Sequence, residues 1–331
     1  MKKAVVTGGA GFIGSHVVDG LIASGASVLV IDDLSSGSHL NLAGAKRHGG
    51  DRLKVLESDI RSDKVLAAIC DFGPTEVFHL AAQMNVRRSV QDPAFDADVN
   101  VRGTVNLLEA ARESKVSTFL FASTGGAIYG EQEKFPADEN HRTCAEAPYG
   151  VSKRAGELYL EYYARTAPMH VVALRYANVY GPRQNPKGEA GVVAIFINRL
   201  LAGSPLTVNG DGGQTRDFVY VGDVVQANLG IAAHAERSQQ SGGFSVYNVG
   251  TGIESSINDL VRVLKKSWQE LAPEEFRSKE VVVTSGPALP GEQRRSVINA
   301  LKLAGAIGWR PEVDFESGIR LTLESFIKGT Q

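Results

Sequence analysis

The sequence predicts a doubly wound α/β fold, in which helices cover both faces of a parallel β-sheet. Three observations predict it. Short apolar runs alternate with helix-length amphipathic segments, the runs are apolar at successive positions, and a glycine-rich turn joins the first run to the first helix. Strands buried on both faces and separated by helices are typical of a parallel sheet. With 331 residues, 43% of them hydrophobic, the chain can form one large or two smaller domains.

The first half of the chain supplies the alternating elements. Six apolar runs are expected to be strands: Lys3–Thr7, Ser27–Ile31, Leu53–Leu56, Glu76–Leu80, Thr118–Ala122 and His170–Arg175. Four segments between them are expected to be helices: Phe12–Ser24, Asp63–Phe72, Phe95–Ser114 and Ala147–Thr166. This order of strand and helix predicts parallel crossover units.

The pattern changes after the sixth run, because residues 177–217 are rich in Gly, Pro and Asn. Further elements are expected at Val192–Leu201, Phe218–Val221, Ser245–Val249, Ile257–Gln269 and Glu316–Ile327. We expect the sheet domain to comprise residues 1–176 and 218–252. A smaller discontinuous C-terminal substrate domain, 177–217 and 253–331, would pack at the carboxyl ends of the strands, where open α/β sheets bind ligands.

The overall composition excludes several classes of function. The net charge is −2, with scattered lysines and arginines, so no nucleic-acid or membrane partner is indicated. No apolar run is long enough to span a bilayer, and the first run is too short for a signal-peptide core. Cys70 and Cys144 form no disulfide framework, so we expect a cytoplasmic protein. The seven histidines are dispersed without metal-ligand spacing, and we expect no metal site.

The first turn carries the spacing of a Rossmann-type dinucleotide site. Gly8, Gly11 and Gly14 lie three residues apart between the first strand and the first helix. Glycines there allow a tight turn and a close approach to a pyrophosphate, which the helix N-terminus binds. Phe12 and Ile13, between the glycines, are expected to contact the same cofactor.

Acidic residues follow the next two strands. Asp32 lies where a carboxylate hydrogen-bonds the hydroxyls of an adenosine ribose, and its charge would repel a 2′-phosphate, so NAD is favoured over NADP. Asp33 follows directly. Asp59 and Ile60 come after the third strand, where they are expected to meet the adenine.

Tyr149 and Lys153 lie four residues apart at the start of a predicted helix, so their side chains share a face. A phenol with an ordinary pKa of about 10 is a poor base at neutral pH. A neighbouring ammonium and a cationic nicotinamide both favour the phenolate and lower that pKa. Two hydroxyls, Ser123 and Thr124, follow the fifth strand, so a proton-transfer site is expected there.

Together these motifs resemble a known family, the nucleotide-sugar 4-epimerases of the extended short-chain dehydrogenase/reductase superfamily. The matching segments are TGGAGFIG (7–14), DDLSSG (32–37), HLAAQ (79–83), NVRGTVNLLEAA (100–111), YGVSK (149–153), LRYANVYGPRQ (174–184) and NGDGGQTRDFVYVGDV (209–224). The resemblance covers nearly the whole chain. It implies NAD as cofactor, a UDP-hexose as substrate, and interconversion of UDP-glucose and UDP-galactose through a 4-keto sugar.

The resemblance implies a role for each catalytic position. Tyr149 would be the base and acid at the sugar O4, and Lys153 would bind the nicotinamide ribose. Thr124, with Ser123 beside it, would hydrogen-bond O4. We prefer Thr124, and the choice between the two hydroxyls stays open at this point.

It also implies the binding residues. The cofactor would be lined and supported by Leu80, Ala81, Ala82 and Asn100. Asn178 would contact the sugar-phosphate, and Arg216 would bind the diphosphate. The family's helices at Phe95–Ser114 and Ala147–Thr166 pack across a two-fold axis, which implies a homodimer.

One late segment departs from the family. Where relatives have Arg-x-Gly-Asp at the nucleotide, this chain has Leu-Pro-Gly-Glu, so Leu289 replaces the arginine and Glu292 the aspartate. Arg294 and Arg295 are candidates to supply the lost charge. Ser296 falls near the position that, in the family, controls room for a 2-N-acetyl group.

The residues after Thr124 bear on the reaction. Related 4,6-dehydratases carry Asp-Glu there to expel water, whereas this chain has Gly125-Gly126. Epimerisation is therefore favoured over elimination. The alternatives are a 4-epimerase of UDP-GlcNAc/UDP-GalNAc or of UDP-glucuronate, a dehydratase or decarboxylase, and a non-catalytic NAD-binding sensor.

Overall fold

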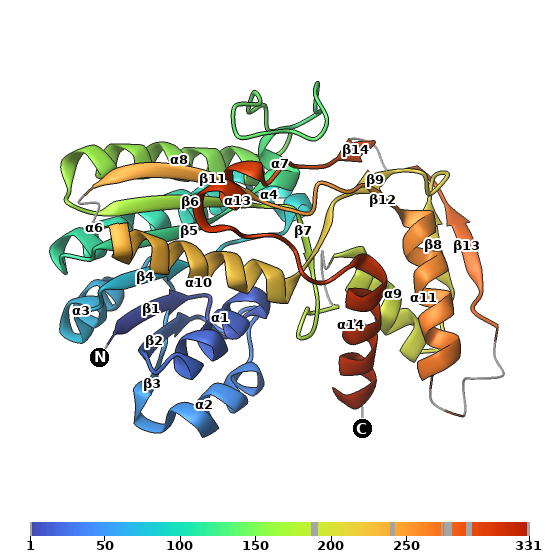
Figure 1. Cartoon of the computed structure of the whole chain (residues 1–331), viewed down its shortest axis with the longest axis horizontal. Coiled ribbons are helices and arrows are strands. Elements are labelled where there is room, and N and C mark those ends of the chain that lie inside the picture. The colour runs from blue at the N-terminus through green and yellow to red at the C-terminus, as the bar shows by residue number, and fades with distance from the viewer. Residues whose placement is uncertain are drawn as a thin grey trace.

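The structure is a computed structural model that describes residues 2–186, 191–238, 242–272, 274, 280–288 and 293–329. A seven-stranded sheet with the order β11-β6-β5-β4-β1-β2-β3 forms its centre (Figure 1). Its strands are β1 Lys3–Thr7, β2 Ser27–Asp32, β3 Leu53–Glu57, β4 Glu76–His79, β5 Thr118–Thr124, β6 His170–Tyr176 and β11 Gly243–Val249. The fold class predicted from the sequence is confirmed.

All neighbouring strands of this sheet run parallel, and their register brings the predicted site residues to one edge. Thr7, the last residue of β1, pairs with Ile31 of β2 and with His79 of β4. Thr124, the last residue of β5, pairs with Tyr176 of β6. The strand order 3-2-1-4-5-6 is that of Rossmann domains, which bind ligands at this carboxyl edge.

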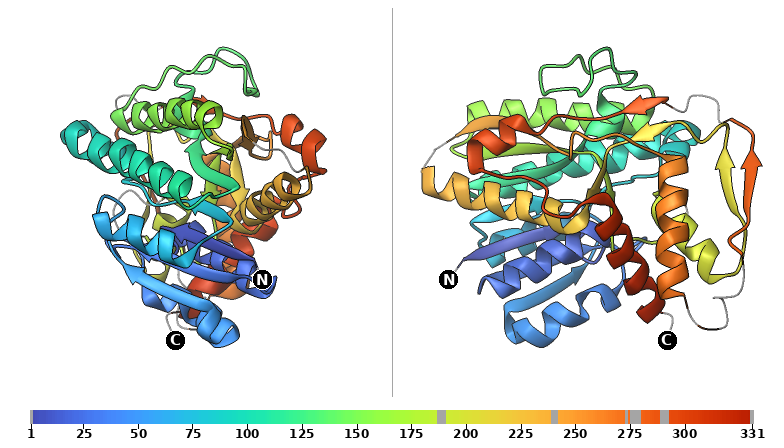
Figure 2. Two further views of the ribbon diagram at one scale, coloured as in Figure 1. Left: turned by 90° about the vertical axis from the view of Figure 1, so that its left-hand side faces the viewer. Right: turned by 45° about the vertical axis from the view of Figure 1, so that its right-hand side comes forward.

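Two layers of helices cover the sheet (Figure 2). One face carries α1 Phe12–Ala23, α2 Ala43–Gly49 and α10 Val221–Ser238; the other carries α3 Asp63–Phe72, α6 Gly103–Glu113 and α8 Pro148–Thr166. In β6, Val172 and Leu174 pack against the first layer, and Val171 and Ala173 against the second. Burial on both faces explains why each strand is a continuous apolar run.

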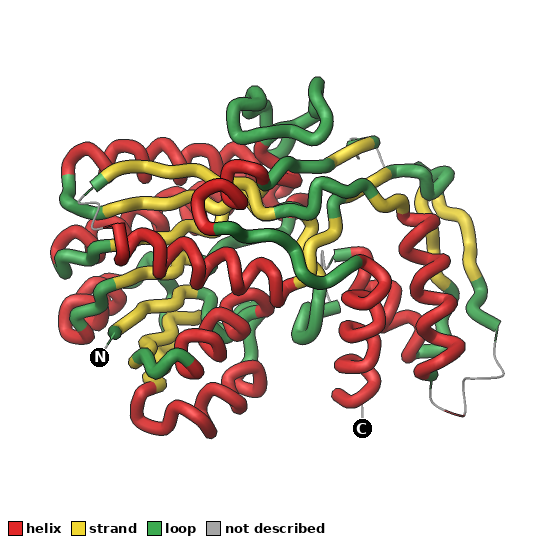
Figure 3. Tube along the Cα trace, in the orientation of Figure 1, coloured by secondary structure: helices red, strands yellow, loops and turns green. Residues whose placement is uncertain are grey.

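Beyond the carboxyl edge lies a second group of elements, seen as short strands and upright helices in Figure 3. Its strands are β7 Asn178–Tyr180, β8 Leu206–Asn209, β9 Thr215–Arg216, β10 Phe218–Tyr220, β12 Ser255–Ser256, β13 Val283–Gly286 and β14 Arg295–Ser296. Its helices are α9 Val192–Leu201, α11 Ile257–Leu271 and α14 Phe315–Gly329. They share an apolar core of their own, in which Leu206, Leu260 and Leu323 are fully buried.

Three of the differences from the expected elements affect the cores and the site. Helix α10 begins directly after β10 without an intervening loop, and no helix was predicted there. Helix α13, Leu301–Ile307, returns to the large sheet, where Leu303 and Trp309 join the first core although they were assigned to the second domain. The segment expected as one helix at Phe95–Ser114 is divided into α5 Pro93–Ala97, a π-helical turn and α6.

The remaining short elements complete the connections. They are η1 His39–Leu42, η2 Gly50–Arg52, α4 Val86–Gln91 and α7 Gly125–Ile128. Among the described residues, no helix combines the length and the hydropathy needed to cross a membrane.

Candidate active site

The glycine turn between β1 and α1 has no room for side chains. Gly8 has a φ of +67°, and its carbonyl oxygen accepts a hydrogen bond from the Gly11 N–H at 3.1 Å. A Cβ on Gly14 would lie only 2.1 Å from the Gly8 oxygen. Phe12 and Ile13 form the first turn of α1, and within the described chain no side chain caps this N-terminus and no acid lies in its first turn. Its N–H groups therefore suit an anion such as a pyrophosphate.

Asp32 closes the turn from the side of β2. Its two carboxylate oxygens accept hydrogen bonds from the Ala10 N–H and the Leu34 N–H, each at 2.9 Å. Burial raises the pKa of Asp32. A Cβ on Gly37 would lie 3.0 Å from Asp32 Oδ1, so the glycine keeps this side of the carboxylate open. Each oxygen retains a lone pair that can accept a hydrogen bond from a ribose hydroxyl.

The other two carboxylates predicted at the nucleotide are engaged within their own loops. Asp33 is exposed and accepts hydrogen bonds from the N–H and hydroxyl of Ser35 at 3.0 and 2.6 Å. Asp59 accepts from the N–H of Arg61 at 2.8 Å and from its guanidinium, which lowers the pKa of Asp59. Ile60, between them, is buried. Asp59 is therefore ion-paired, and an adenine bound beside it would contact a carboxylate whose charge Arg61 already compensates.

The segment after β4 lies against the glycine turn. The Leu80 N–H donates to the Thr7 carbonyl at 3.1 Å, and the Ala81 N–H donates to the Thr7 hydroxyl at 3.3 Å. A Cβ on Gly8 would lie 2.7 Å from the Ala81 nitrogen. Ala82 follows, half-buried. The structure thus brings these three residues to the edge of the sheet beside the turn.

A buried hydrogen-bonded chain, which the sequence analysis missed, joins this turn to the catalytic end. Thr104 donates its hydroxyl hydrogen to the Asn100 carbonyl at 2.7 Å, so its oxygen accepts from His79 Nε2 at 2.9 Å. His79 Nδ1 then accepts from the Thr7 hydroxyl at 2.8 Å. Burial lowers the pKa of His79 well below its ordinary value, so the ring is neutral. The only signal in the sequence is polar residues among core positions.

Asn100 lies on the π-helical turn η3, Asp98–Arg102, and its side-chain amide is fully used. Oδ1 accepts from the Gln83 N–H at 2.8 Å, while Nδ2 donates to the Gln83 carbonyl at 2.8 Å. Nδ2 also lies 3.1 Å from Asp96 Oδ1 and 3.3 Å from Ser152 Oγ. Asn100 therefore fastens the loop after β4 to helix α8, as π-helical turns at functional sites often do.

Tyr149 and Lys153 lie on the first turns of α8, which begins at Pro148 with a proline in its first turn. Lys153 is 3% exposed, and its Nζ donates to the Ala122 carbonyl of β5 at 2.9 Å. The same Nζ lies 4.7 Å from the centre of the Phe121 ring and 6.0 Å from that of Tyr149. The predicted pair is thus together, beside the end of β5.

The two pKa values are governed by burial. Burial lowers the pKa of Lys153 to about 8, although the charges of Asp96 and Glu157 oppose the shift. Burial also raises the pKa of Tyr149, and Asp96 raises it further. In the protein without a nicotinamide the pKa of Tyr149 is therefore raised, because the phenol is removed from water. The lowering expected from the ammonium together with a cationic nicotinamide stays a prediction.

The two hydroxyls at the end of β5 point to different partners. Ser123 is buried and donates to Glu157 Oε1 at 2.7 Å. Glu157 also binds the guanidinium of Arg175 at 2.7 Å, so Ser123 belongs to a buried ionic network. Thr124 accepts a hydrogen bond from the Ala127 N–H at 3.2 Å as the N-cap of α7. Its O–H hydrogen has no partner within the described part of the chain.

Gly125 is tightly packed, whereas Gly126 leaves space beside Thr124. A Cβ on Gly125 would lie 2.6 Å from Ile298 Cδ1, so packing excludes a side chain there. A Cβ on Gly126 would lie 3.6 Å from Asn178 Oδ1 and 3.9 Å from the Thr124 hydroxyl, within ordinary contact distance. A side chain at position 126 would therefore project between Thr124 and Asn178.

The residues predicted to bind the nucleotide are partly described. Arg216 Nη1 donates to the Gln293 carbonyl at 2.9 Å, and Arg216 pairs in register with Ser296, which is buried. Leu289 and Glu292 lie outside the described residues.

The two arginines considered as replacements for the family arginine are both paired. Arg294 makes two hydrogen bonds to the Asp211 carboxylate at 2.6 and 2.9 Å. Arg295 binds Glu254 and lies 3.8 Å over the Phe135 ring. A diphosphate would therefore compete with an existing ion pair at either position.

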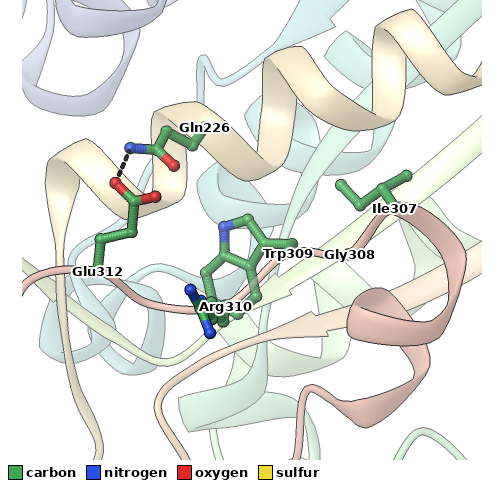
Figure 4. Close-up of a pocket in the computed structure, with 6 residues that line it drawn as sticks. All are labelled: Gln226, Ile307, Gly308, Trp309, Arg310 and Glu312. Carbon is green, nitrogen blue, oxygen red and sulfur yellow. Dashed lines mark hydrogen bonds between the residues drawn. The ribbon is translucent and has the colours of Figure 1, made fainter.

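An open depression of about 450 Å³ lies elsewhere, between α10 and the segment after α13 (Figure 4). It is lined by Gln226, Ile307, Gly308, Trp309, Arg310 and Glu312. The indole nitrogen of Trp309 already donates to the Asp223 carbonyl at 3.0 Å, and the Gln226 amide donates to the Glu312 carboxylate at 3.1 Å. None of these residues is a predicted site residue.

The glycine turn gives a testable prediction. Gly14→Ala should lower the free energy of unfolding by about 1–3 kcal/mol, because its Cβ would overlap the Gly8 oxygen. Gly305→Ala, also in a helix but with nothing within 4 Å of its Cβ, should raise it by up to about 1 kcal/mol. Denaturant unfolding of both variants measures this, and equal effects would contradict the proposed crowding.

Comparison with known proteins agrees with this geometry. The family model described as "NAD dependent epimerase/dehydratase family" matches residues 4–250. A UDP-glucose 4-epimerase of Mycolicibacterium smegmatis is 41% identical over 329 residues, which cover 99% of this chain and 100% of the relative.

Two solved structures extend the likeness to three dimensions. A UDP-glucose 4-epimerase of Thermotoga maritima, solved with UDP-glucose, is 43% identical with a TM-score of 0.88 and covers 99% of this chain and 100% of its own. A UDP-glucose 4-epimerase of Thermus thermophilus, in complex with NAD, is 42% identical with a TM-score of 0.85, covering 98% and 99%. The chain therefore belongs to the NAD dependent epimerase/dehydratase family.

Proposed function

We propose that this protein is an NAD-dependent nucleotide-sugar 4-epimerase that interconverts UDP-glucose and UDP-galactose through a 4-keto sugar. The observation that carries the proposal is the Tyr149–Lys153 pair of α8, in which the buried Lys153 donates to the Ala122 carbonyl of β5, two residues before Thr124. The relatives of Mycolicibacterium smegmatis and Thermotoga maritima, which bear the name of this activity, support it.

NAD fits the residues at the first turn. The uncapped N-terminus of α1 suits a pyrophosphate, and Asp32 offers lone pairs to the ribose while repelling a 2′-phosphate. When bound, NAD would supply a reversible hydride acceptor for C4 of the sugar, which allows reduction from the opposite face. Because it is regenerated, it is expected to stay bound.

The chain's own residues move and hold the proton. Tyr149 accepts the proton of the sugar O4 and later returns it. Thr124 donates its hydroxyl hydrogen to O4, because its oxygen already accepts from the Ala127 N–H. Burial raises the pKa of Tyr149, so the phenolate requires a neighbouring positive charge, and the Lys153 ammonium supplies it from the next turn of the helix.

We further propose a division of labour between the two parts of the chain. Residues 1–176 and 218–252 would hold NAD, and residues 177–217 and 253–331 the nucleotide sugar. Asn178 would contact the sugar-phosphate, with Arg216 and Glu292 at the diphosphate and ribose. Support comes from Asn178 Oδ1, which faces the space beside Thr124 and Gly126.

The chemistry beside Thr124 favours epimerisation over dehydration. Elimination of water from a 4-keto sugar needs an acid and a base near C5 and C6. Gly125 and Gly126 supply neither, and the space beside Gly126 stays open for the sugar to turn over.

A homodimer is proposed from the outer face of α8. Val151, Leu158 and Tyr162 recur at spacings of seven and four and are 56%, 52% and 52% exposed. Such a stripe of large apolar side chains on one helix face marks an interface more often than a solvated surface. A second copy of α6 and α8 would cover it and form a four-helix bundle.

A cytoplasmic location is proposed from the cysteines. Cys70 and Cys144 are both exposed free thiols. Exposed free thiols persist in reducing compartments, where disulfide formation is suppressed.

The dimer face gives a prediction. Leu158→Glu with Tyr162→Glu should convert a dimer into a monomer, because the interface would bury two unpaired charges. Analytical ultracentrifugation measures the mass. Leu301→Glu, which changes a 75% exposed leucine of α13, should leave the mass unchanged. A wild-type monomer would contradict the proposal.

The proposed reaction is tested with purified protein, UDP-galactose and no added NAD, followed by NMR of the sugar nucleotides. UDP-glucose should appear, and the same equilibrium mixture should be reached from either substrate. No conversion even after NAD is added would exclude UDP-galactose and direct the test to N-acetyl and uronate sugars.

The two hydroxyls give a matched pair of variants. Thr124→Ala should lower kcat by about 10²-fold, because it removes a donor to the reacting oxygen. Ser123→Ala should keep kcat within a few-fold of the wild-type value and lower the free energy of unfolding by about 1 kcal/mol, because the Ser123 hydroxyl donates its hydrogen bond to Glu157. The reverse pattern, measured by steady-state kinetics and denaturant unfolding, would assign the catalytic role to Ser123.

A further inference from the structure

Asp96 is a fully buried carboxylate for which the reaction outlined above has no use. It lies on α5 and is 0% exposed. Its Oδ1 accepts hydrogen bonds from Gln83 Nε2 at 2.9 Å and from Asn100 Nδ2 at 3.1 Å. Its Oδ2 is buried without a hydrogen-bond partner in the described chain. A buried carboxylate with an unpaired oxygen is costly, so its position requires an explanation.

The hydrogen bonds of Asp96 lead directly to the catalytic helix. Asn100 Nδ2, which Asp96 holds, also reaches Ser152 Oγ at 3.3 Å. Ser152 precedes Lys153 and donates to the Tyr149 carbonyl at 3.0 Å. The Tyr149 N–H is fixed in turn by the buried Ser89 of α4 at 3.1 Å. The first turn of α8 is therefore held against α4, α5 and the π-helical turn.

The cations around Asp96 differ in how their charge is compensated, and Arg61 is paired with Asp59 and Asp98. The guanidinium groups of Arg61 and Arg88 lie over the ring of the preceding residue, Phe95, at 5.5 and 4.1 Å. Two further titratable groups act on Lys153 or lie beside it. His79 is neutral, and Glu157 binds Arg154 and Arg175. Lys153 makes no ion pair in the described chain; its Nζ hydrogen-bonds a carbonyl.

We propose that Asp96 is a positioning residue, whose buried charge keeps Lys153 as an ammonium and whose Oδ1 holds Asn100 against the first turn of α8. The inference rests on the proposed function for its catalytic meaning. Its electrostatic part concerns only residues of this chain.

The charge of Asp96 has opposite consequences for the two members of the pair. It raises the pKa of Lys153, which favours the charged ammonium, and it raises the pKa of Tyr149, which opposes the phenolate. Asp96 thus preserves the cation at the cost of a less acidic phenol. Asp96 therefore shifts to higher pH the range in which Tyr149 is a phenolate and Lys153 is an ammonium.

Asp96→Asn tests this, because the amide oxygen still accepts from Gln83 and Asn100 while the charge is lost. In the pH profile of kcat/KM, the acid and alkaline limbs report the two macroscopic pKa values of the coupled Tyr149–Lys153 pair, and the charge of Asp96 raises the pKa of both groups. Both limbs should move to lower pH, each by about one unit. A purely structural role would lower the whole profile without moving either limb, and that result would overturn the proposal.

A second measurement does not depend on turnover. With lysine labelled at 13Cε, an NMR pH titration of the purified enzyme should show one resonance that titrates with a midpoint of about pH 8. The Lys153→Arg variant should lack this resonance. Asp96→Asn should lower this midpoint by about one pH unit. An unchanged midpoint overturns the proposal. A lowered midpoint in a protein that does not epimerise UDP-galactose would instead remove the proposed function and leave the charge assignment standing.

Glu76→Gln is the matched control. Glu76 is also buried with one unpartnered oxygen, but it lies at the opposite end of β4 and interacts with Lys2 and Glu236. It should leave both limbs of the profile and the Lys153 midpoint in place. A shift equal to that of Asp96→Asn would show a general response to lost charge and would overturn the proposal.

Discussion

The site depends on the burial of one ammonium group. Lys153 is removed from water, and three weak substitutes replace its hydration: the Ala122 carbonyl, the face of the Phe121 ring and carboxylates at a distance. The carbonyl and the ring belong to β5 and the carboxylates to α5 and α8, so these three elements have to be positioned together. The Asn100 amide, with every polar atom used, provides that positioning.

The sheet could be predicted from the sequence because its strands are buried on both faces, and such strands appear as continuous apolar runs. The six predicted runs match the strands to within two residues at each end. Helix α10 escaped prediction because it starts at Val221, directly after a strand, and no turn residue separates them. The π-helical turn escaped because one extra residue in a helix leaves no distinct pattern of residue types.

The site was predictable where chemistry depends on local spacing and unpredictable where it depends on a distant partner. Tyr149 and Lys153 share a face because four residues make about one turn. Ser123, in contrast, donates its hydrogen bond to Glu157 on another element, and the guanidinium that binds Asp59 is shared with Asp98 of the π-helical turn. Likewise, the Tyr149 pKa followed burial, which the sequence motif does not contain.

The strand order has a consequence for how the protein is made. The first strand synthesised, β1, lies in the centre of the sheet, whereas β11, at Gly243–Val249, forms an edge. A nascent chain therefore exposes the unpaired edge of β6 until residue 249 has left the ribosome, and such edges invite pairing with other chains. Helix α14, which ends at Gly329, completes the second core. The second core thus closes only after α14 has been synthesised, so a chain that terminates before this helix has a complete sheet but an incomplete second core.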